Sequence, residues 1–598
     1  MVRLQGWIPA FAGMTMRFGT RHPGEGRDPV LCLSLRRLAF FTIVVLTGIA
    51  LTILLVRVLA PGGWTVPKIG ILVAFIGVAP WLGVCAGNAL LGFLLLVCAR
   101  DPARAVLAVG KQAEAAPITA RTAIAVTVRN EDMAPVLAAL QRLMRGLSQY
   151  GDRFAAFVLS DSDDAHAAAE AAAIAVFPWP LRYRRRAENS GFKAGNVMDF
   201  LDHHAGGFEL ALMLDADSEM SAKAVLRLAR IMQASPRMAV VQHLTVGRPA
   251  VSAFPRMFQF GMRAGMRVWA TGQAWWQGNE GPYWGHNAVI RIAPFREHCR
   301  LEKFILSHDQ VEAARLAAAG WGVAVWPRED GSLEANPPAL PEFMHRDARW
   351  LAGNFQYFSL LRAPGLRAMG RWQLLQAILL MAGAPLYTLM LALAAISAAS
   401  GGGTEFPRGR MLALTLAWTL CIYAPKLCGY AETLLFRDRR ARYGGGAAFA
   451  AGAVAEFFFT LLLDALTQVS KTIAAVRFML DARPAWRPQN RTDRGVGWGE
   501  ATRLLWPHTL FGMAVFALLA QASWLAALWA LPFAGGLLVA IPFCVVTSSP
   551  RVSAWARRHG IAAIPEEILT AEQNRDTRGF GEPVFPDPRA DILQQAGD

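Results

Sequence analysis

Long uncharged apolar runs constrain the fold of this chain more than any other feature. Leu38–Val56 and Ile71–Cys98 contain no charged residue, and about 20 apolar residues in a helix cross the hydrocarbon core of a bilayer. After a mixed stretch the apolar runs resume at Trp372–Ala398, Met411–Phe436, Ala447–Gln468 and Leu504–Val546. The last run is long enough for two spans, with a turn near Gln521–Ser523. The sequence therefore predicts a multi-pass membrane protein with a soluble domain at residues 100–371.

Composition agrees with this class of protein. The 598 residues have a mean hydropathy of +0.30 and only 17% charged side chains, which excludes a disordered or collagen-like chain. The net charge of +16 would also suit a nucleic-acid-binding protein. However, basic residues cluster beside apolar runs, as at Arg36-Arg37 and Arg557-Arg558, where they orient membrane segments. We expect no nucleic-acid partner.

The first 34 residues differ from the rest. They are rich in Gly, Pro and Arg and lack the apolar core of a cleavable signal peptide. They are interpreted as a disordered tail, or as a stretch upstream of a true start at Met16 or later.

The soluble part alternates short apolar runs with Ala-rich helical stretches. The predicted strands are Thr122–Val128, Ala155–Leu159, Glu209–Leu214, Met238–Val246 and Val323–Pro327. The predicted helices include Met133–Leu147, Ala165–Val176 and Ser221–Ala234. Strands that alternate with helices form a mostly parallel sheet covered on both faces, and ligands bind beyond the carboxyl ends of its strands.

Acidic clusters follow three of these strands. They are Thr127–Asp132, Ser160–Asp164 and Leu214–Ser218, the last containing Asp215-Ala216-Asp217. Converging carboxylates need a cation, and Mg²⁺ takes one or two protein carboxylates and completes its shell with phosphate oxygens. The D-x-D therefore indicates a metal–diphosphate clamp, although two Asp in a turn can also be simple turn formers.

A basic segment, Tyr183–Asn196, lies between these clusters. Its glycines allow a ligand to approach closely, and Lys193 offers a point charge for phosphate. The alternative is a solvated basic edge strand. That alternative is sufficient for Arg184–Arg186 but explains Lys193–Asn196 poorly.

Three motifs precede the return of the apolar runs: Tyr283–Asn287, Ser307–Asp309 and Arg346–Asn354. The aromatic faces of Trp284 and Trp350 suit stacking on sugar rings, and a nearby arginine suits a pyrophosphate. Trp350 is also suited to anchoring at a membrane interface.

This order of motifs resembles the membrane-embedded synthases of glycosyltransferase family 2. The finer likeness, over roughly residues 35–560, is to the glucosyltransferases of osmoregulated periplasmic glucan synthesis. It is carried by Tyr283–Asn287, Ile305–Asp309, Gly331–Glu334 with Pro337-Pro338, and Arg346–Asn354. Two positions depart from the wider pattern. Arg346 stands where the Q of Q-x-x-R-W would be, and Ser307-His308-Asp309 replaces T-E-D, and both departures look like this glucan subfamily.

The resemblance implies a GT-A fold that binds UDP-glucose and transfers glucose with inversion to a growing β-glucan. Asp309 would be the general base. The implied donor-binding residues are Thr127, Glu131, Asp161 or Asp163, Lys193, Asp215 and Arg349. Asp215 and Asp217 would hold Mg²⁺ or Mn²⁺. Trp284, His286 and Trp350 would bind the acceptor.

The resemblance also implies a location in the bacterial inner membrane, with the catalytic domain cytoplasmic and with an acyl carrier protein or a periplasmic glucan-modifying protein as possible partners. Another family 2 synthase and a transferase acting on a lipid-linked acceptor are the rival enzymes. A transporter with a regulatory domain would predict inverted repeats among the spans, and none is visible.

The expected organisation has six spans. Two lie in residues 35–99, two in 372–436 and two in 504–547, and the tail 548–598 is cytoplasmic. We predict that Ala447–Gln468, within the cytoplasmic segment 437–503, does not span. Its residues Glu456, Thr460, Asp464, Thr467 and Lys471 form a polar stripe on one helical face, as in a helix at an interface. The alternative is a span whose stripe lines a glucan channel.

Overall fold

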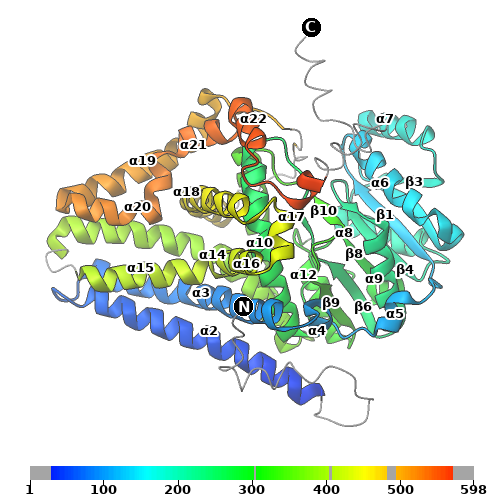
Figure 1. Ribbon diagram of the computed structural model, residues 1–598, viewed down its shortest axis with the longest axis horizontal. Helices are drawn as coiled ribbons and strands as arrows, with labels where there is room; N and C mark the ends of the chain where they lie inside the picture. Colours follow the sequence, from blue (N-terminus) through cyan, green and yellow to red (C-terminus); the bar gives the residue numbers. More distant parts are fainter. Residues whose placement is uncertain (1–28, 302–304, 403–406, 481–489, 491–492, 570–598) are drawn as a thin grey trace, which may run out of the picture.

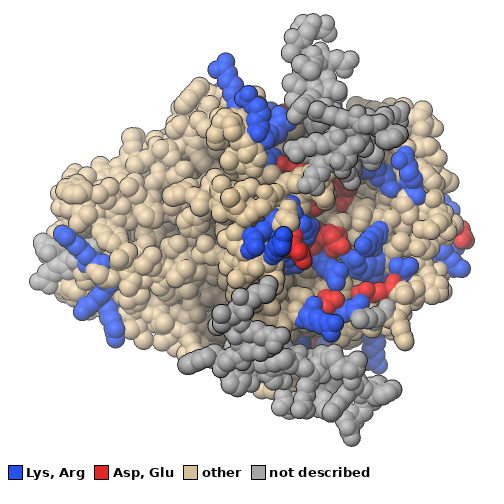
Figure 2. All heavy atoms as spheres, in the orientation of Figure 1, with Lys and Arg blue, Asp and Glu red and all other residues tan. Residues whose placement is uncertain are grey.

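A computed structural model describes residues 29–301, 305–402, 407–480, 490 and 493–569, as a bundle of long helices beside an α/β domain (Figure 1). The bundle contains α2 (Pro29–Leu59), α3 (Val66–Cys98), α14 (Ala368–Ser397), α15 (Arg408–Ile422), α16 (Ala424–Leu435), α18 (Gly446–Met479), α19 (Trp498–Ala522), α20 (Trp524–Leu538) and α21 (Ala540–Thr547). Within the described residues, five helices are long and apolar enough to cross a membrane. The number rises to seven if the bent pairs α15–α16 and α20–α21 each form one span. On the face shown in Figure 2, this half of the molecule carries few charged side chains.

The α/β domain contains a seven-stranded sheet in the order β3-β2-β1-β4-β8-β6-β9. The strands are β1 (Thr122–Val128), β2 (Phe154–Ser160), β3 (Leu181–Arg185), β4 (Leu210–Asp215), β6 (Met238–His243), β8 (Ala288–Arg291) and β9 (Gly322–Trp326). A second sheet has the order β5-β10-β7, from Glu219–Met220, Ser332–Glu334 and Val246–Gly247. All pairs in the large sheet are parallel except those of β8, which is antiparallel to β4 and β6.

Helices cover both faces of the large sheet. Its strands alternate their side chains, as period-two geometry requires: Ile124 and Val126 pack in one core, and Ala123 and Ala125 pack in the other. The first core includes α6 (Met133–Leu147) and α9 (Ala222–Ala234). The second includes α8 (Phe192–His203), α11 (Ile292–His298) and α12 (Asp309–Ala318). The predicted α/β class is therefore confirmed.

Element boundaries agree closely with the sequence prediction. β1 and α6 have the predicted bounds, and β2, β4, α7 (Asp164–Ala175) and α9 differ by one residue at one or both ends. The predicted strand Met238–Val246 divides into β6 and β7. Four short strands were not predicted as such: β5, β8, β10, and β3 at the sheet edge. Arg184 and Arg185 therefore lie in an edge strand, as the alternative supposed, but Arg186 follows β3 and its side chain is nearly buried against Asp161.

Two amphipathic helices lie between the α/β domain and the bundle. α10 (Ala253–Gln277) packs against α3, α16 and α18, and α13 (Leu340–Gln356) packs against α14 and α18. The chain thus inserts its sheet domain between apolar helices, as predicted.

A network of ion pairs around the buried Glu329 carboxylate connects the α/β domain to the helices beside it. The Glu329 carboxylate, after β9, contacts Arg263 of α10 at 3.2 Å, and Arg439 and Arg442 of α17 (Arg437–Arg442) at 3.2 and 3.1 Å. Arg267 lies 3.9 Å away. Although burial opposes ionisation of a carboxyl, these four guanidiniums lower the pKa of Glu329 to about 2.

The helix that contains Ala447–Gln468 contacts the sheet domain's helices near both of its ends. Phe449 near the start of α18 packs on Phe260 of α10, with ring centroids 5.2 Å apart, and Phe478 near its end packs on Phe355 of α13 at 5.8 Å. In Figure 1, α18 is drawn strongly foreshortened, whereas α2, α14 and α19 extend across the view. Length and composition alone would also allow α18 to span, so its interfacial location stays a prediction.

The polar stripe of α18 faces neighbouring helices. Glu456 accepts a hydrogen bond from Lys426 of α16 at 2.5 Å, and Asp464 accepts one from the Tyr423 hydroxyl at 2.7 Å. Lys471 pairs with Asp347 of α13 at 3.3 Å. The stripe is therefore satisfied inside the protein, as buried polar groups require.

The chain ends are only partly described. α2 begins at Pro29, before the predicted limit of the tail at residue 34, and residues 1–28 and 570–598 lie outside the described part. α19 ends at Ala522 and α20 begins at Trp524, which confirms the turn predicted near Gln521–Ser523. After α21 the chain forms α22 (Pro550–Arg558).

Candidate active site

The D-x-D motif is held in a tight turn at the end of β4. The backbone N–H of Asp215 donates to the Ser218 hydroxyl at 3.0 Å, and the N–H of Ser218 donates back to the Asp215 carbonyl at 3.0 Å. Thr127, its register partner on β1, directs its hydroxyl at the Leu214 carbonyl and the Asp215 carboxylate, at 3.3 and 3.4 Å. Two predicted donor-binding residues therefore meet where adjacent parallel strands end.

Lys193, in the first turn of α8, reaches the same carboxylate. Its ammonium contacts Asp215 and donates to the Gly285 carbonyl at 3.0 Å. Gly285 has φ of 83°, which favours glycine. A methyl group at Gly285 would lie 3.4 Å from the Asp309 Cβ and 3.7 Å from its Oδ2. The predicted base therefore lies against the loop that Lys193 holds.

Asp309 is the first residue of α12, and its surroundings are charged. Burial raises its pKa, while the neighbouring imidazole of His308 lowers it. The His308 ring lies 2.9 Å from the Glu312 carboxylate. Burial lowers the pKa of His308, but the negative charge and hydrogen bond of Glu312 raise it by more, so the net shift of this pKa is upward. An Asp whose pKa is raised toward neutrality suits general-base work.

Glu334 of β10 brings a further carboxylate toward the D-x-D. Its carboxylate lies 3.4 Å from the His286 ring. Burial raises the pKa of Glu334; His286 opposes the shift, and Asp217 adds to it. The pairing of β10 with β5 explains this approach, since β5 follows the D-x-D directly.

Arg346, Arg349 and Trp350 lie on α13. The Arg346 guanidinium lies 4.6 Å from the Trp350 ring centroid and 5.2 Å from that of Phe343, which is cation–π geometry. Burial lowers the pKa of Arg346, and Asp347, Glu334 and Asp217 oppose that shift. Trp350 is 47% exposed, so the part of its ring that Arg346 does not cover can meet a ligand. The departure from Q-x-x-R-W therefore adds a half-buried cation that interacts electrostatically with two acidic residues of the site, Glu334 and Asp217.

Two carboxylates of the second acidic cluster, Ser160–Asp164, form ion pairs or hydrogen bonds with neighbouring residues. Asp161 forms a two-pronged ion pair with Arg186, with both N–O distances 2.7 Å, and both side chains are nearly buried. Removing one partner of such a pair typically costs about 3–5 kcal/mol. Asp163 caps α7 by accepting from the His166 N–H at 3.1 Å, and hydrogen bonds from His166 lower the pKa of Asp163. Both carboxylates thus have structural partners beside any role toward the nucleoside.

The residues available for a cation are Asp215 and Asp217. Within the described part of the chain, no three His, Cys, Asp or Glu side chains group as a metal site. Two carboxylates in one turn are nevertheless hard oxygen ligands, and Mg²⁺ completes its shell with phosphate and water. The donor set therefore fits a divalent cation that arrives with a diphosphate.

Comparison with known proteins shows that the chain is similar to glycosyltransferases. Residues 210–431 match the model of Glycosyl transferase family group 2. The chain is 30% identical to a glucans biosynthesis glucosyltransferase H of Xanthomonas campestris over 94% of its own length and 91% of that protein. It is 32% identical to the protein of that name from Bradyrhizobium diazoefficiens, over 87% and 74%.

The chain belongs to the glucans biosynthesis glucosyltransferase H family.

Among solved structures, it is similar to a mannosyltransferase from Pyrobaculum calidifontis in complex with GDP-Man and Mn²⁺. The identity is 16%, the TM-score is 0.39, and the match covers 67% of this chain and 99% of the other.

For this member of the glucans biosynthesis glucosyltransferase H family, the structure brings Thr127, Lys193, Asp215 and Asp309 together through the contacts above. Glu131 lies in the loop after β1, at the same sheet edge, and Trp284 and His286 flank Gly285. Three charged residues of the site could not be assigned from the sequence: Arg186, Glu334 and Arg346. Each stands in a quoted motif, but only tertiary structure shows which carboxylates it meets.

Proposed function

We propose that this glucosyltransferase uses UDP-glucose as donor and extends a β-glucan with inversion at the anomeric carbon. The observation that carries the proposal is the chain of contacts from Asp215 through Lys193 and Gly285 to Asp309. It joins a diphosphate-binding edge to a carboxylate suited to act as base.

Donor binding uses the edge formed by β1 and β4. Thr127 and Glu131, with Asp161 or Asp163, hold the uridine, and Lys193 and Arg349 neutralise the diphosphate. Asp215 and Asp217 would hold Mg²⁺ or Mn²⁺, which supplies positive charge to the departing diphosphate. Lys193 is close enough to Asp215 to act on the same phosphates.

Asp309 accepts the proton of the acceptor hydroxyl as that oxygen attacks the anomeric carbon. A positioned general base contributes roughly 10²–10⁴-fold to the rate. Trp284, His286 and Trp350 bind the acceptor, and the exposed Trp350 ring offers an apolar face for a sugar. A single displacement turns an α-linked donor into a β-linked product.

The proposed topology has six spans in the bacterial inner membrane, with the catalytic domain cytoplasmic and α18 at the cytoplasmic interface. Several contacts support it. Arg494, after α18, donates to Glu342 of α13 at 2.8 Å, and Ser553 of α22 accepts from the Ala253 N–H of α10 at 2.9 Å. Both segments therefore lie on the side of the catalytic domain.

The opposite side is marked by Arg410, at the start of α15, which donates to the Arg57 carbonyl near the end of α2 at 3.1 Å. In the proposed six-span topology, the chain crosses the membrane an even number of times between any two segments that contact the catalytic domain. This arrangement also keeps the basic residues after α16 cytoplasmic, as the positive-inside rule favours.

The test uses the purified full-length chain in detergent. UDP release is measured with UDP-glucose, and separately with UDP-galactose, UDP-N-acetylglucosamine and GDP-mannose. We expect release from UDP-glucose that depends on Asp309. Faster turnover of another nucleotide sugar would contradict the donor assignment. Transfer only to a lipid-linked acceptor would favour the lipid-acceptor alternative.

A further inference from the structure

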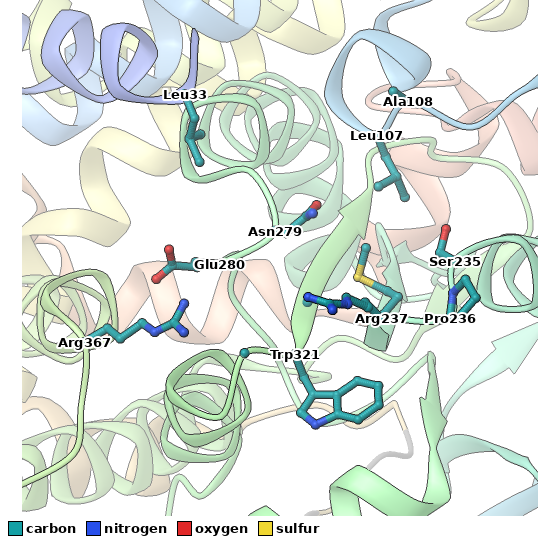
Figure 3. A pocket seen from close by; sticks show the side chains of 13 residues that line it. Leu33, Leu107, Ala108, Ser235, Pro236, Arg237, Asn279, Glu280, Trp321 and Arg367 are labelled. Atoms are coloured by element: carbon teal, nitrogen blue, oxygen red, sulfur yellow. The ribbon is translucent and has the colours of Figure 1, made fainter. Parts of the chain in front are cut away.

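A cavity of about 470 Å³ lies at the edge of the sheet opposite the D-x-D (Figure 3). Its floor contains the first residues of β6 and β9, Met238 and Gly322, whereas the candidate active site lies beyond the carboxyl ends of β1 and β4. The donor and acceptor roles assigned above therefore leave this cavity without a function.

The cavity is basic. Arg237 and Arg367 line it from two sides, and neither forms an ion pair within the described residues. Its one carboxylate, Glu280, is already neutralised by Arg37 at 3.1 Å. Two guanidiniums that face a shared cavity without an acidic partner are suited to a phosphate group.

The cavity also has apolar lining residues, including one from the helix bundle and two from the segment that joins α3 to the sheet domain. Leu33 of α2 and Leu107 line it, together with Ala108. Leu107 and Ala108 follow α4 (Pro102–Val106), which comes directly after α3. A ligand here would therefore meet cationic and apolar groups together.

The position of the cavity relative to the helix bundle favours the phosphate of a lipid headgroup over free inorganic phosphate. Leu33 lies one helical turn before Arg36 and Arg37, after which the uncharged run of α2 begins. Arg367 caps α14 a turn before its own apolar run. In the proposed topology, both residues lie just outside the hydrocarbon core, at the depth of lipid headgroups.

We propose that this cavity binds the headgroup of an anionic phospholipid. Arg237 and Arg367 contact the phosphate, and the acyl chains extend along α2 and α14 into the bilayer. The inference rests on the proposed membrane placement of α2 and α14 and not on the transfer reaction.

The experiment titrates the delipidated full-length chain with phosphatidylglycerol and counts bound lipid by native mass spectrometry. Two variants test the cavity in different ways. Arg237→Glu/Arg367→Glu reverses its charge, and Ala108→Trp fills it from an exposed position. The matched control, Arg551→Glu/Arg558→Glu, makes the same change of charge on α22, away from the cavity.

We expect both site variants to weaken the tightest phosphatidylglycerol binding at least tenfold, and the control to leave it unchanged. Equal binding of phosphatidylcholine, displacement by millimolar inorganic phosphate, or unchanged binding in Ala108→Trp would overturn the proposal. UDP-glucose binding, measured in parallel, reports on the folded catalytic domain. A topology reporter on α2 separates a failed lipid site from a failed membrane placement.

Discussion

Lys193 contacts the Asp215 carboxylate and the Gly285 carbonyl at the same time. One ammonium thus joins the D-x-D turn to the loop that carries Trp284 and His286. Because Gly285 packs against Asp309, the same residue links the D-x-D turn to the proposed base. The position of the D-x-D turn and the position of the Gly285 loop therefore both depend on the Lys193 side chain.

Asp309→Asn should reduce kcat at least 100-fold, because the amide cannot accept the proton of the acceptor hydroxyl. Binding of UDP-glucose should stay within about threefold of the unaltered chain, since loss of a general base affects turnover more than ground-state affinity. Calorimetry measures the affinity for UDP-glucose, and single-turnover kinetics measure the rate of transfer. A variant with more than a tenth of normal turnover would remove Asp309 from the mechanism.

The pH dependence of kcat should report the charge around Asp309. Asp309 works as a carboxylate, so activity is lost as pH falls through its folded-state pKa. Burial raises that pKa, so the acidic limb should lie above the range of an exposed Asp.

Replacing His308 with Gln removes the imidazole that lowers the pKa of Asp309 and leaves Glu312, which raises it. The acidic limb should then move to still higher pH, while kcat at alkaline pH changes little. A limb that stays in place or moves to lower pH would contradict this electrostatic account.

Asp217→Ala should abolish metal-dependent UDP binding together with activity, because it removes one of two carboxylates available to a cation. Titration of Mg²⁺ and Mn²⁺ against UDP binding measures the effect. Asp202→Ala is a suitable control, because it removes a carboxylate that has no role in the proposed site and pairs with the largely exposed Arg300, and such surface ion pairs contribute about 1 kcal/mol or less. A normal metal requirement in Asp217→Ala would move the metal site elsewhere.

The topology predicts that alkaline phosphatase fused near Asn490 is inactive, because the segment after α18 is cytoplasmic. The same reporter fused near Gly63, between α2 and α3, should be active. Phosphatase activity at Asn490 would make α18 a span and would favour a polar stripe that lines a channel.

Much of the fold was predictable because its signals are local. The α6 helix has an amphipathic pattern and an Asp132 cap, and β1 is a continuous apolar run bounded by polar residues. Strands β3, β8 and β10 have three to five residues, too few for periodicity to distinguish a strand from a loop.

The candidate site also has some contacts that local sequence signals predicted and others that they did not. Parallel strand ends brought Thr127 and Asp215 together as the sequence indicated. By contrast, Asp161 meets Arg186 because the short edge strand β3 pairs with β2, and this strand was not predicted. Glu334 comes near enough to Asp217 for its pKa to be affected, and this approach depends on the small sheet. The β5–β10 pairing that carries Glu334 toward the D-x-D involves two register pairs, and no sequence pattern marks it.

Membrane vesicles supplied with UDP-[¹⁴C]glucose and a divalent cation test the central claim most directly. The account predicts that labelled glucose enters a polymer whose linkages are entirely β by NMR, and that Asp309→Asn vesicles make none. A polymer with α linkages, or normal synthesis by the Asp309→Asn vesicles, would contradict it.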